Sequence, residues 1–226
     1  MIFFFFLALF IQIGVCSSAD ISRDFDISGI GKLYEGDIIL SPEQREEFVN
    51  EKDGEEGGEL RQKRQVFKGE NYPKNVWGET IYYRFSPQSD TTLREEFKYA
   101  AKAWEQDTCI NFEENRKAKE GLYIMTKYPI CASRIGKVGG WWQALYLGYG
   151  CDTFGKIAHE LGHALGLVHT ASRPDRDKYI MVNTTNIKEE YAKQLVRHNS
   201  TVESYGLGYD YGSIMHYRQR RYTSGN

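Results

Sequence analysis

Three histidines and a glutamate stand close together between His159 and His169. His159 and His163 are four residues apart, so on a helix their side chains share one face, with Cβ atoms about 5–6 Å apart. Glu160 lies beside them, near enough to hydrogen-bond a metal-bound water without being a ligand. Gly166 can end such a helix in a left-handed cap, after which the chain turns and brings in His169. Three neutral imidazoles with an open fourth position are typical of a catalytic zinc site.

The bare pattern His-Glu-x-x-His also occurs by chance on ordinary helices, which is the alternative interpretation. Here the glycine and the third histidine follow at the offsets that a zinc site requires, and the pattern uses three of the five histidines in the chain. The extended pattern is the metzincin signature, which also requires a methionine turn below the metal. We therefore predict one zinc ion per chain and a peptidase activity.

Other elements must hold this stretch in place. Residues 80–85 are rich in β-branched and aromatic side chains and predict a strand. Residues 92–95 match a capping box, which would open a helix with the apolar stripe Leu93, Phe97, Ala100, Ala101 and Trp104. Residues 109–112 and 122–125 are short strand candidates, and residues 155–167 are the predicted metal-binding helix. A strand, a helix, further strands and an active-site helix indicate an α+β fold.

The beginning of the chain has the features of a secretory leader. Residues 2–15 form an apolar run with a single polar side chain, shorter than the roughly 20 residues that span a membrane. Small residues follow at 17–19, so we predict a signal peptide over residues 1–19 and a secreted, extracellular protein without a stable membrane span. The run has no preceding Lys or Arg, which leaves an uncleaved anchor as the alternative. Sequons at Asn183 and Asn199 predict glycosylation in the same compartment.

Charge and cysteine content limit the partners further. A net charge of -2 offers no basic face, so we expect no nucleic-acid partner. Of the four cysteines, Cys16 would leave with the signal peptide. Cys131 and Cys151 flank a glycine-rich segment, which favours a disulfide between them. Cys109 is then left over, and either pairs with another chain or has its partner in sequence outside these 226 residues.

Residues 20–64 differ in composition from the rest of the chain. They are acidic, densely so between residues 43 and 59, and carry few hydrophobic residues. We expect an extended or partly disordered segment that cannot form a core of its own. It ends in a basic cluster at residues 61–64, which could be a solvated charge run. At this composition boundary we predict instead a convertase cut after Arg64, giving a propeptide of residues 20–64 and a catalytic domain of residues 65–226.

Beyond the third histidine the chain carries Arg-Pro-Asp-Arg-Asp-Lys-Tyr at residues 173–179 and Ser-Ile-Met-His-Tyr at residues 213–217. Together with the zinc motif, these segments resemble the astacin family of metzincin endopeptidases. The helix motif alone is equally similar to a matrixin, but here the methionine turn lies far downstream and has the astacin form. Residues 131–151 are also similar to the astacin disulfide loop. The resemblance covers roughly residues 34–217 and implies a zincin-like catalytic domain with a small twisted sheet, an active-site helix and a methionine turn.

The resemblance also implies a role for each matching residue. The zinc ligands would be His159, His163 and His169, Glu160 the general base, and Met215 the apolar floor of the site. Tyr217 would be the phenol that binds zinc at rest and swings away to stabilise the reacting carbonyl oxygen. The implied substrates are extracellular proteins or peptides.

The resemblance has further implications for the prosegment, for one departure from the family pattern and for the C-terminal end of the sequence. Tyr-Glu-Gly-Asp at residues 34–37 is similar to the prosegment motif of the family, so Asp37 would cap the zinc in a zymogen. The chain departs from the family pattern at Thr170, where a glutamate usually stands. The sequence stops at Asn226, which implies an incomplete C-terminal subdomain. The alternative function is therefore a truncated, catalytically inactive or regulatory protein that retains the zinc site.

Overall fold

The computed structural model describes residues 30, 33–50, 66–67, 74–183, 185, 187, 195, 197–198, 202–203 and 206–217. Within these residues, no helix has the length and apolar character needed to cross a membrane. The predicted signal peptide, the cleavage site after Arg64 and the sequon at Asn199 lie outside the described residues. Asn183 is described and exposed.

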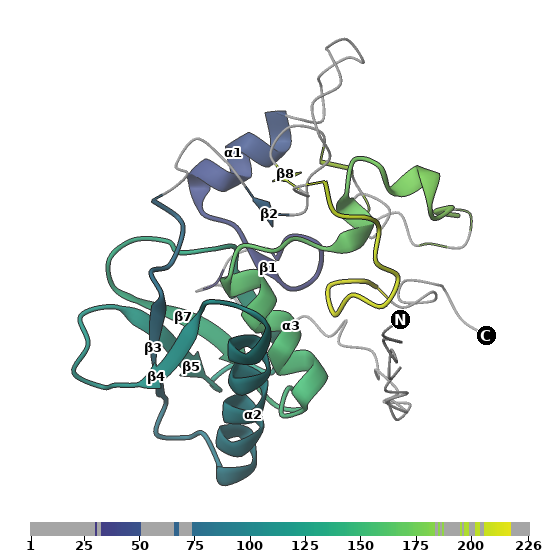
Figure 1. The fold of residues 1–226 in the computed structure, drawn as a ribbon. Coiled ribbons are helices and arrows are strands. Elements are labelled where there is room, and N and C mark those ends of the chain that lie inside the picture. Colours follow the sequence, from purple (N-terminus) through teal and green to yellow (C-terminus); the bar gives the residue numbers. More distant parts are fainter. Residues whose placement is uncertain are drawn as a thin grey trace, which may run out of the picture.

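A six-stranded sheet forms the centre of the fold (Figure 1), in the order β1-β6-β7-β5-β3-β4. Its strands are β1 (Ile38–Ile39), β3 (Thr80–Phe85), β4 (Asn111–Glu114), β5 (Gly121–Met125), β6 (Cys131–Arg134) and β7 (Trp142–Leu147). Neighbouring strands run parallel, except that β6 and β7 are antiparallel. Strands β2 (Val66–Phe67) and β8 (Val202–Glu203) form a separate antiparallel pair. The observed α+β fold confirms the predicted class.

The helices are α1 (Pro42–Asn50), α2 (Thr91–Asp107) and α3 (Phe154–Ala164), with short 3₁₀ turns at Thr170–Ser172 and Arg176–Lys178. Helices α2 and α3 lie side by side next to the sheet (Figure 1). Their apolar faces and the inward residues of β3, β5 and β7 form the main core, which includes Ile81, Phe97, Leu122, Leu145, Ile157 and Leu161. Burial of this core fixes α3 rigidly against the sheet.

Local sequence signals account for several of these elements. Strand β3 has the predicted bounds, and α2 buries most of its predicted stripe, at Leu93, Phe97, Ala100 and Ala101. The predicted capping box at residues 92–95 is wrong, because the helix begins at Thr91 and its cap is Asp90. The Asp90 carboxylate accepts a hydrogen bond from the Leu93 backbone N–H at 2.8 Å. Ionised Asp is a strong cap, since it also complements the helix dipole.

The acidic segment contains more structure than its composition predicts. The expectation of an extended chain is wrong for residues 42–50, which form α1. The helix begins with a capping box, in which Ser41 Oγ accepts from the Gln44 N–H and Gln44 Oε1 accepts from the Ser41 N–H. Phe48 is 1% exposed and Ile38 is 0% exposed, and both pack against residues of the predicted catalytic domain. The segment has no core of its own and shares that of its neighbour.

Candidate metal centre

Helix α3 carries the first two histidines of the motif, and the loop after it carries the third. The helix ends at Ala164, and Gly166 adopts φ 105°, the left-handed conformation that favours glycine. The Gly166 and Leu167 N–H groups donate back to the carbonyls of His163 and Gly162 at 2.8 and 2.9 Å. This turn reverses the chain so that His169 lies beside the helix, with its Nε2 3.2 Å from Nε2 of His159.

Each of the three imidazoles donates its Nδ1–H to an oxygen acceptor. His159 Nδ1 lies 2.8 Å from the Ile214 carbonyl, and His163 Nδ1 lies 2.8 Å from the Leu167 carbonyl. His169 Nδ1 lies 2.6 Å from the Glu35 carboxylate. Since these oxygens accept and cannot donate, Nδ1 carries the proton in each neutral imidazole, which leaves the Nε2 lone pair for a metal ion. Such partners orient metal-binding histidines and set their tautomer.

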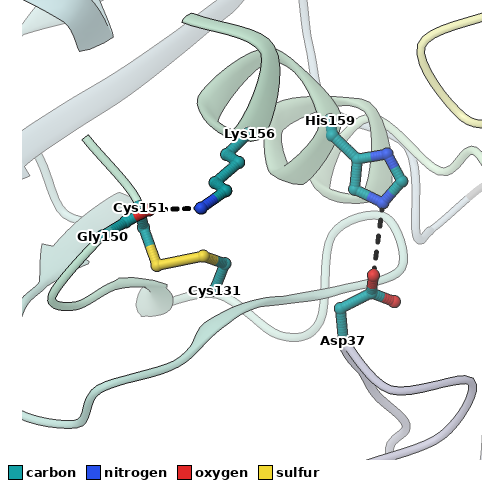
Figure 2. The surroundings of a disulfide bond; sticks show 6 residues. All are labelled: Asp37, Cys131, Gly150, Cys151, Lys156 and His159. Atoms are coloured by element: carbon teal, nitrogen blue, oxygen red, sulfur yellow. Dashed lines mark hydrogen bonds and ion pairs between the residues drawn. A yellow bond between two sulfur atoms is a disulfide. The ribbon is translucent and has the colours of Figure 1, made fainter. Parts of the chain in front are cut away.

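The fourth group at this point is Asp37, from the acidic segment. Figure 2 shows its carboxylate facing the His159 ring, at 3.4 Å from Nε2. The distances from Asp37 to Nε2 of His163 and His169 are 3.5 and 3.1 Å. Tetrahedral zinc with bonds of about 2.0–2.2 Å separates its ligand atoms by about 3.3–3.6 Å. The observed distances of 3.1–3.5 Å are close to this range, so the four groups could surround a zinc ion.

Burial supports the same assignment. His163 and His169 are both 0% exposed, and Asp37 is 5% exposed. The Nε2 atom of His163 is buried and accepts no hydrogen bond among the described residues. A buried polar atom without a partner is costly unless an ion occupies the space before it. Together Asp37, His159, His163 and His169 are the one group of the described residues whose ligand atoms could jointly hold a metal ion.

In the absence of metal, the buried charges strongly perturb the titration of this cluster. Burial disfavours the charged form of His169, but the nearby Asp37 and Glu35 carboxylates outweigh this and raise its pKa to about 9. Burial dominates at His163 and lowers its pKa to about 4. For Glu35, burial alone would raise the pKa, but hydrogen bonds from His169 and His198 lower it to about 2. Burial also opposes ionisation of Asp37, yet the charge and hydrogen bonds of the histidines lower its pKa. Both carboxylates are thus ionised near neutral pH.

The methionine turn lies directly under the zinc helix. Met215 is 0% exposed, and its carbonyl accepts the N–H of Thr170 at 2.9 Å. A Cβ atom on Gly162 would lie 2.5 Å from the sulfur of Met215, so a larger residue there would have to displace the methionine side chain. The turn therefore contacts the segments that carry all three histidines. Glu160 is 2% exposed on the same helix, next to His159.

Tyr217 approaches the cluster from the side of His169 that faces away from Asp37. Its hydroxyl lies 2.6 Å from His169 Nδ1 and donates to the Glu35 carbonyl at 2.7 Å. Because Asp37 contacts the opposite nitrogen, Nε2, the phenol is outside the group of four donor atoms. Its role as a zinc ligand in another state stays a prediction.

The acidic segment also occupies the edge of the sheet. Strand β1 pairs in parallel with β6, with Ile38 opposite Ser133 and Ile39 opposite Arg134. The Ser133 N–H donates to the Asp37 carbonyl at 3.0 Å, which places Asp37 at the end of the added strand. Backbone pairing thus fixes the position of Asp37 relative to the histidines.

A disulfide bond lies near the start of α3. Cys131, at the start of β6, is bonded to Cys151, just before α3, as the sequence predicted (Figure 2). Lys156 Nζ donates to the Gly150 carbonyl at 2.6 Å and ties the helix to the same loop. Among the described residues, Cys109 is a free and exposed thiol.

Sequence reasoning missed several polar residues that surround the site. Glu35 contacts His169, and its other oxygen contacts Ser172 and His198. Arg173 is 1% exposed and was noted only as part of a motif. Glu35 could have been suspected from its place two residues before Asp37 in the prosegment motif. No local pattern marks Ser172 or His198.

Comparison with known proteins identifies the family. A family model described as Astacin, a family of peptidases, matches residues 69–226. The chain belongs to the astacin family of zinc metalloproteinases. Zinc is accordingly the metal that the four donor atoms fit.

Similar astacins come from several animals. The chain is 38% identical to zinc metalloproteinase nas-31 of Caenorhabditis elegans over 187 residues, which is 82% of this chain and 30% of that protein. It is 38% identical to bone morphogenetic protein 1 of Xenopus laevis over 157 residues, 68% of this chain and 22% of that protein. The chain therefore spans about a third or less of the length of these relatives.

A solved structure agrees with the fold. High choriolytic enzyme 1, a hatching enzyme zinc-protease from Oryzias latipes (medaka fish), superposes with a TM-score of 0.60 at 30% identity. The match covers 71% of this chain and 77% of the hatching enzyme. This likeness supports the astacin-type arrangement of sheet, active-site helix and methionine turn.

Proposed function

We propose that this astacin is a secreted zinc endopeptidase in its latent, zymogen form. The observation that carries the proposal is the position of Asp37, whose carboxylate lies 3.1–3.5 Å from the Nε2 atoms of all three histidines. In a catalytic zinc site the fourth position belongs to water or substrate. A carboxylate held there excludes that water, so the chain must lose or move its prosegment before it can hydrolyse peptides.

The reaction is peptide-bond hydrolysis in extracellular proteins. Bound zinc would acidify a coordinated water and polarise the carbonyl of the scissile bond. Glu160 would take a proton from the attacking water and deliver it to the leaving amine, acting as base and then acid. Tyr217, released from Glu35 when the prosegment departs, donates its O–H to the negative charge that develops on the carbonyl oxygen. His159, His163 and His169 would hold the metal through Nε2.

Activation would follow a cut after Arg64 by a dibasic-specific convertase, with the signal peptide of residues 1–19 already removed. Among the described residues, the contacts that would then hold the prosegment on the catalytic domain are those of Ile30 and residues 33–50. Its dissociation would free the fourth metal position and the edge of β6. The extracellular substrates, the convertase and glycosylation at Asn183 and Asn199 all belong to this proposal.

The test compares the intact chain with the chain cut after Arg64, each with and without a chelator, on a protein substrate. We expect hydrolysis only from the cut, zinc-loaded form. Glu160→Gln should keep its zinc, measured by metal analysis, and lose nearly all activity. Zinc binding without hydrolysis in the cut wild-type chain would support the inactive or regulatory alternative. Full activity of Glu160→Gln would exclude the proposed base.

A further inference from the structure

The Glu35 carboxylate is completely buried and receives three hydrogen bonds. Its exposure is 0%, and its oxygens lie 2.6 Å from His169 Nδ1, 2.6 Å from Ser172 Oγ and 3.3 Å from His198 Nε2. All three donors come from the catalytic domain, although Glu35 belongs to the prosegment. A buried charge requires such partners, because burial without them is very costly.

The three donors surround one buried point and form a pocket. Ser172 and His198 are each 1% exposed, and the His198 backbone N–H donates to the Ser172 carbonyl at 2.9 Å. That bond joins two segments of the catalytic domain and places both side chains around one point. His169 presents Nδ1 to the same point, because its Nε2 faces the position where a metal would bind. Three donors that converge on one point suit the two oxygens of a carboxylate.

The backbone conformation of the prosegment places the Glu35 side chain in this pocket. Glu35 adopts φ 49°, a left-handed conformation that residues other than glycine rarely hold, and Gly36 follows at φ 90°. Its carbonyl accepts the Tyr217 hydroxyl at 2.7 Å. The Phe48 and His198 rings pack edge to face, with centroids 4.4 Å apart. The strained turn persists because these contacts determine it from several sides.

We propose that Ser172, His198 and Nδ1 of His169 form a carboxylate-binding pocket beside the metal, and that Glu35 fills it as a second anchor of the prosegment. This inference rests on the proposed zymogen function. It assigns latency to two carboxylates with different receptors: Asp37 is held at the metal and Glu35 in the pocket behind the third histidine. The two anchors are separated by one residue and contact opposite nitrogens of His169, so each contributes its own hold on the prosegment.

The experiment measures opening of the prosegment in the intact, zinc-loaded chain by hydrogen exchange of residues 33–48. Hydrogen bonds to a charged group are among the stronger ones, so Glu35→Gln should speed exchange about 10–100-fold. Ser172→Ala tests the same contact from the catalytic domain and should speed exchange several-fold. Glu46→Gln, an exposed site in the same segment, is the matched control and should stay within about twofold of wild type.

Two double variants distinguish a role of Glu35 in anchoring the prosegment from a role that only supports the His169 side chain. Adding Ser172→Ala to Glu35→Gln should change exchange little further, because both substitutions remove one interaction. In an Asp37→Asn background, Glu35→Gln should still accelerate exchange by a similar factor. The proposal is overturned if Glu35→Gln exchanges within twofold of wild type, if the Ser172 and Glu35 effects multiply, or if Asp37→Asn abolishes the Glu35 effect. Hydrogen exchange does not depend on peptidase activity. This test and the test of the proposed function can therefore fail separately.

Discussion

Arg173 joins the segment after the zinc ligands to the segment that leads into the methionine turn. Its side chain is 1% exposed and pairs with Asp175, with Nε at 3.0 Å and Nη2 at 3.3 Å from the two carboxylate oxygens. The same guanidinium donates to the carbonyls of Leu207 and Gly208 at 2.9 and 3.1 Å. Arg173→Met would keep most of the volume and remove all of these donors.

The expected loss is large because the partners stay buried. Breaking a buried ion pair from one side costs about 3–5 kcal/mol, since the other charge is left uncompensated. At about 2–4 °C per kcal/mol for a chain of this size, the melting temperature should fall by roughly 6–20 °C. The melting temperature of Arg173→Lys should lie between those of the wild type and Arg173→Met, because an ammonium keeps the charge but cannot reproduce the bidentate contact with Asp175. Loosening of residues 206–217 should also speed zinc loss to a chelator.

Thermal unfolding of the zinc-loaded chain, together with the rate of zinc release, measures both effects. Arg116→Met is the matched control, since this arginine is exposed, and should change stability by less than about 0.5 kcal/mol. Adding Asp175→Asn to Arg173→Met removes the stranded charge and should recover part of the loss. A loss under about 1 kcal/mol for Arg173→Met, or a double variant less stable than the single one, would refute this reasoning.

Three other outcomes are expected. Replacing Cys131 and Cys151 by serine should lower the free energy of unfolding by about 3 kcal/mol, measured by denaturant titration, because a loop with a sequence separation of 20 is no longer closed in the unfolded chain; an unchanged midpoint would contradict this. In the metal-free chain, His169 contributes stability that is complete below pH 6.5 and lost as the pH rises through its folded-state pKa of about 9, so the melting temperature should fall across that window only without zinc. Asp37→Asn should give the intact chain measurable peptidase activity without a cut after Arg64, and an inactive but zinc-loaded intact variant would argue against Asp37 as the block.

Local patterns in the sequence were sufficient for the chemistry at the centre of the site. The spacing of His159, His163 and His169 predicts metal binding because helical periodicity and the left-handed glycine are properties of neighbouring residues. Strand β3 was predictable for the same reason. Strands β6 and β7 were not predicted: β6 has four residues, and β7 buries a polar residue, Gln143, whose amide donates to the Gly136 carbonyl at 2.9 Å. Burial of a hydrogen-bonded amide leaves no apolar alternation to read.

Only the tertiary structure determines which polar groups that are far apart in the sequence come into contact. Glu35 is separated from His169 by 134 residues and from His198 by 163, and no short-range pattern relates them. Their contact depends on β1 pairing with β6 and on α1 packing against the catalytic domain, which are long-range backbone and packing interactions. Sequence spacing was therefore sufficient to predict the three histidines of the candidate site, whereas Asp37 reaches them through the pairing of β1 with β6. The partners of Glu35 and the groups that orient the histidines were determined by the fold, because buried charges are stabilised only by partners that folding brings to them.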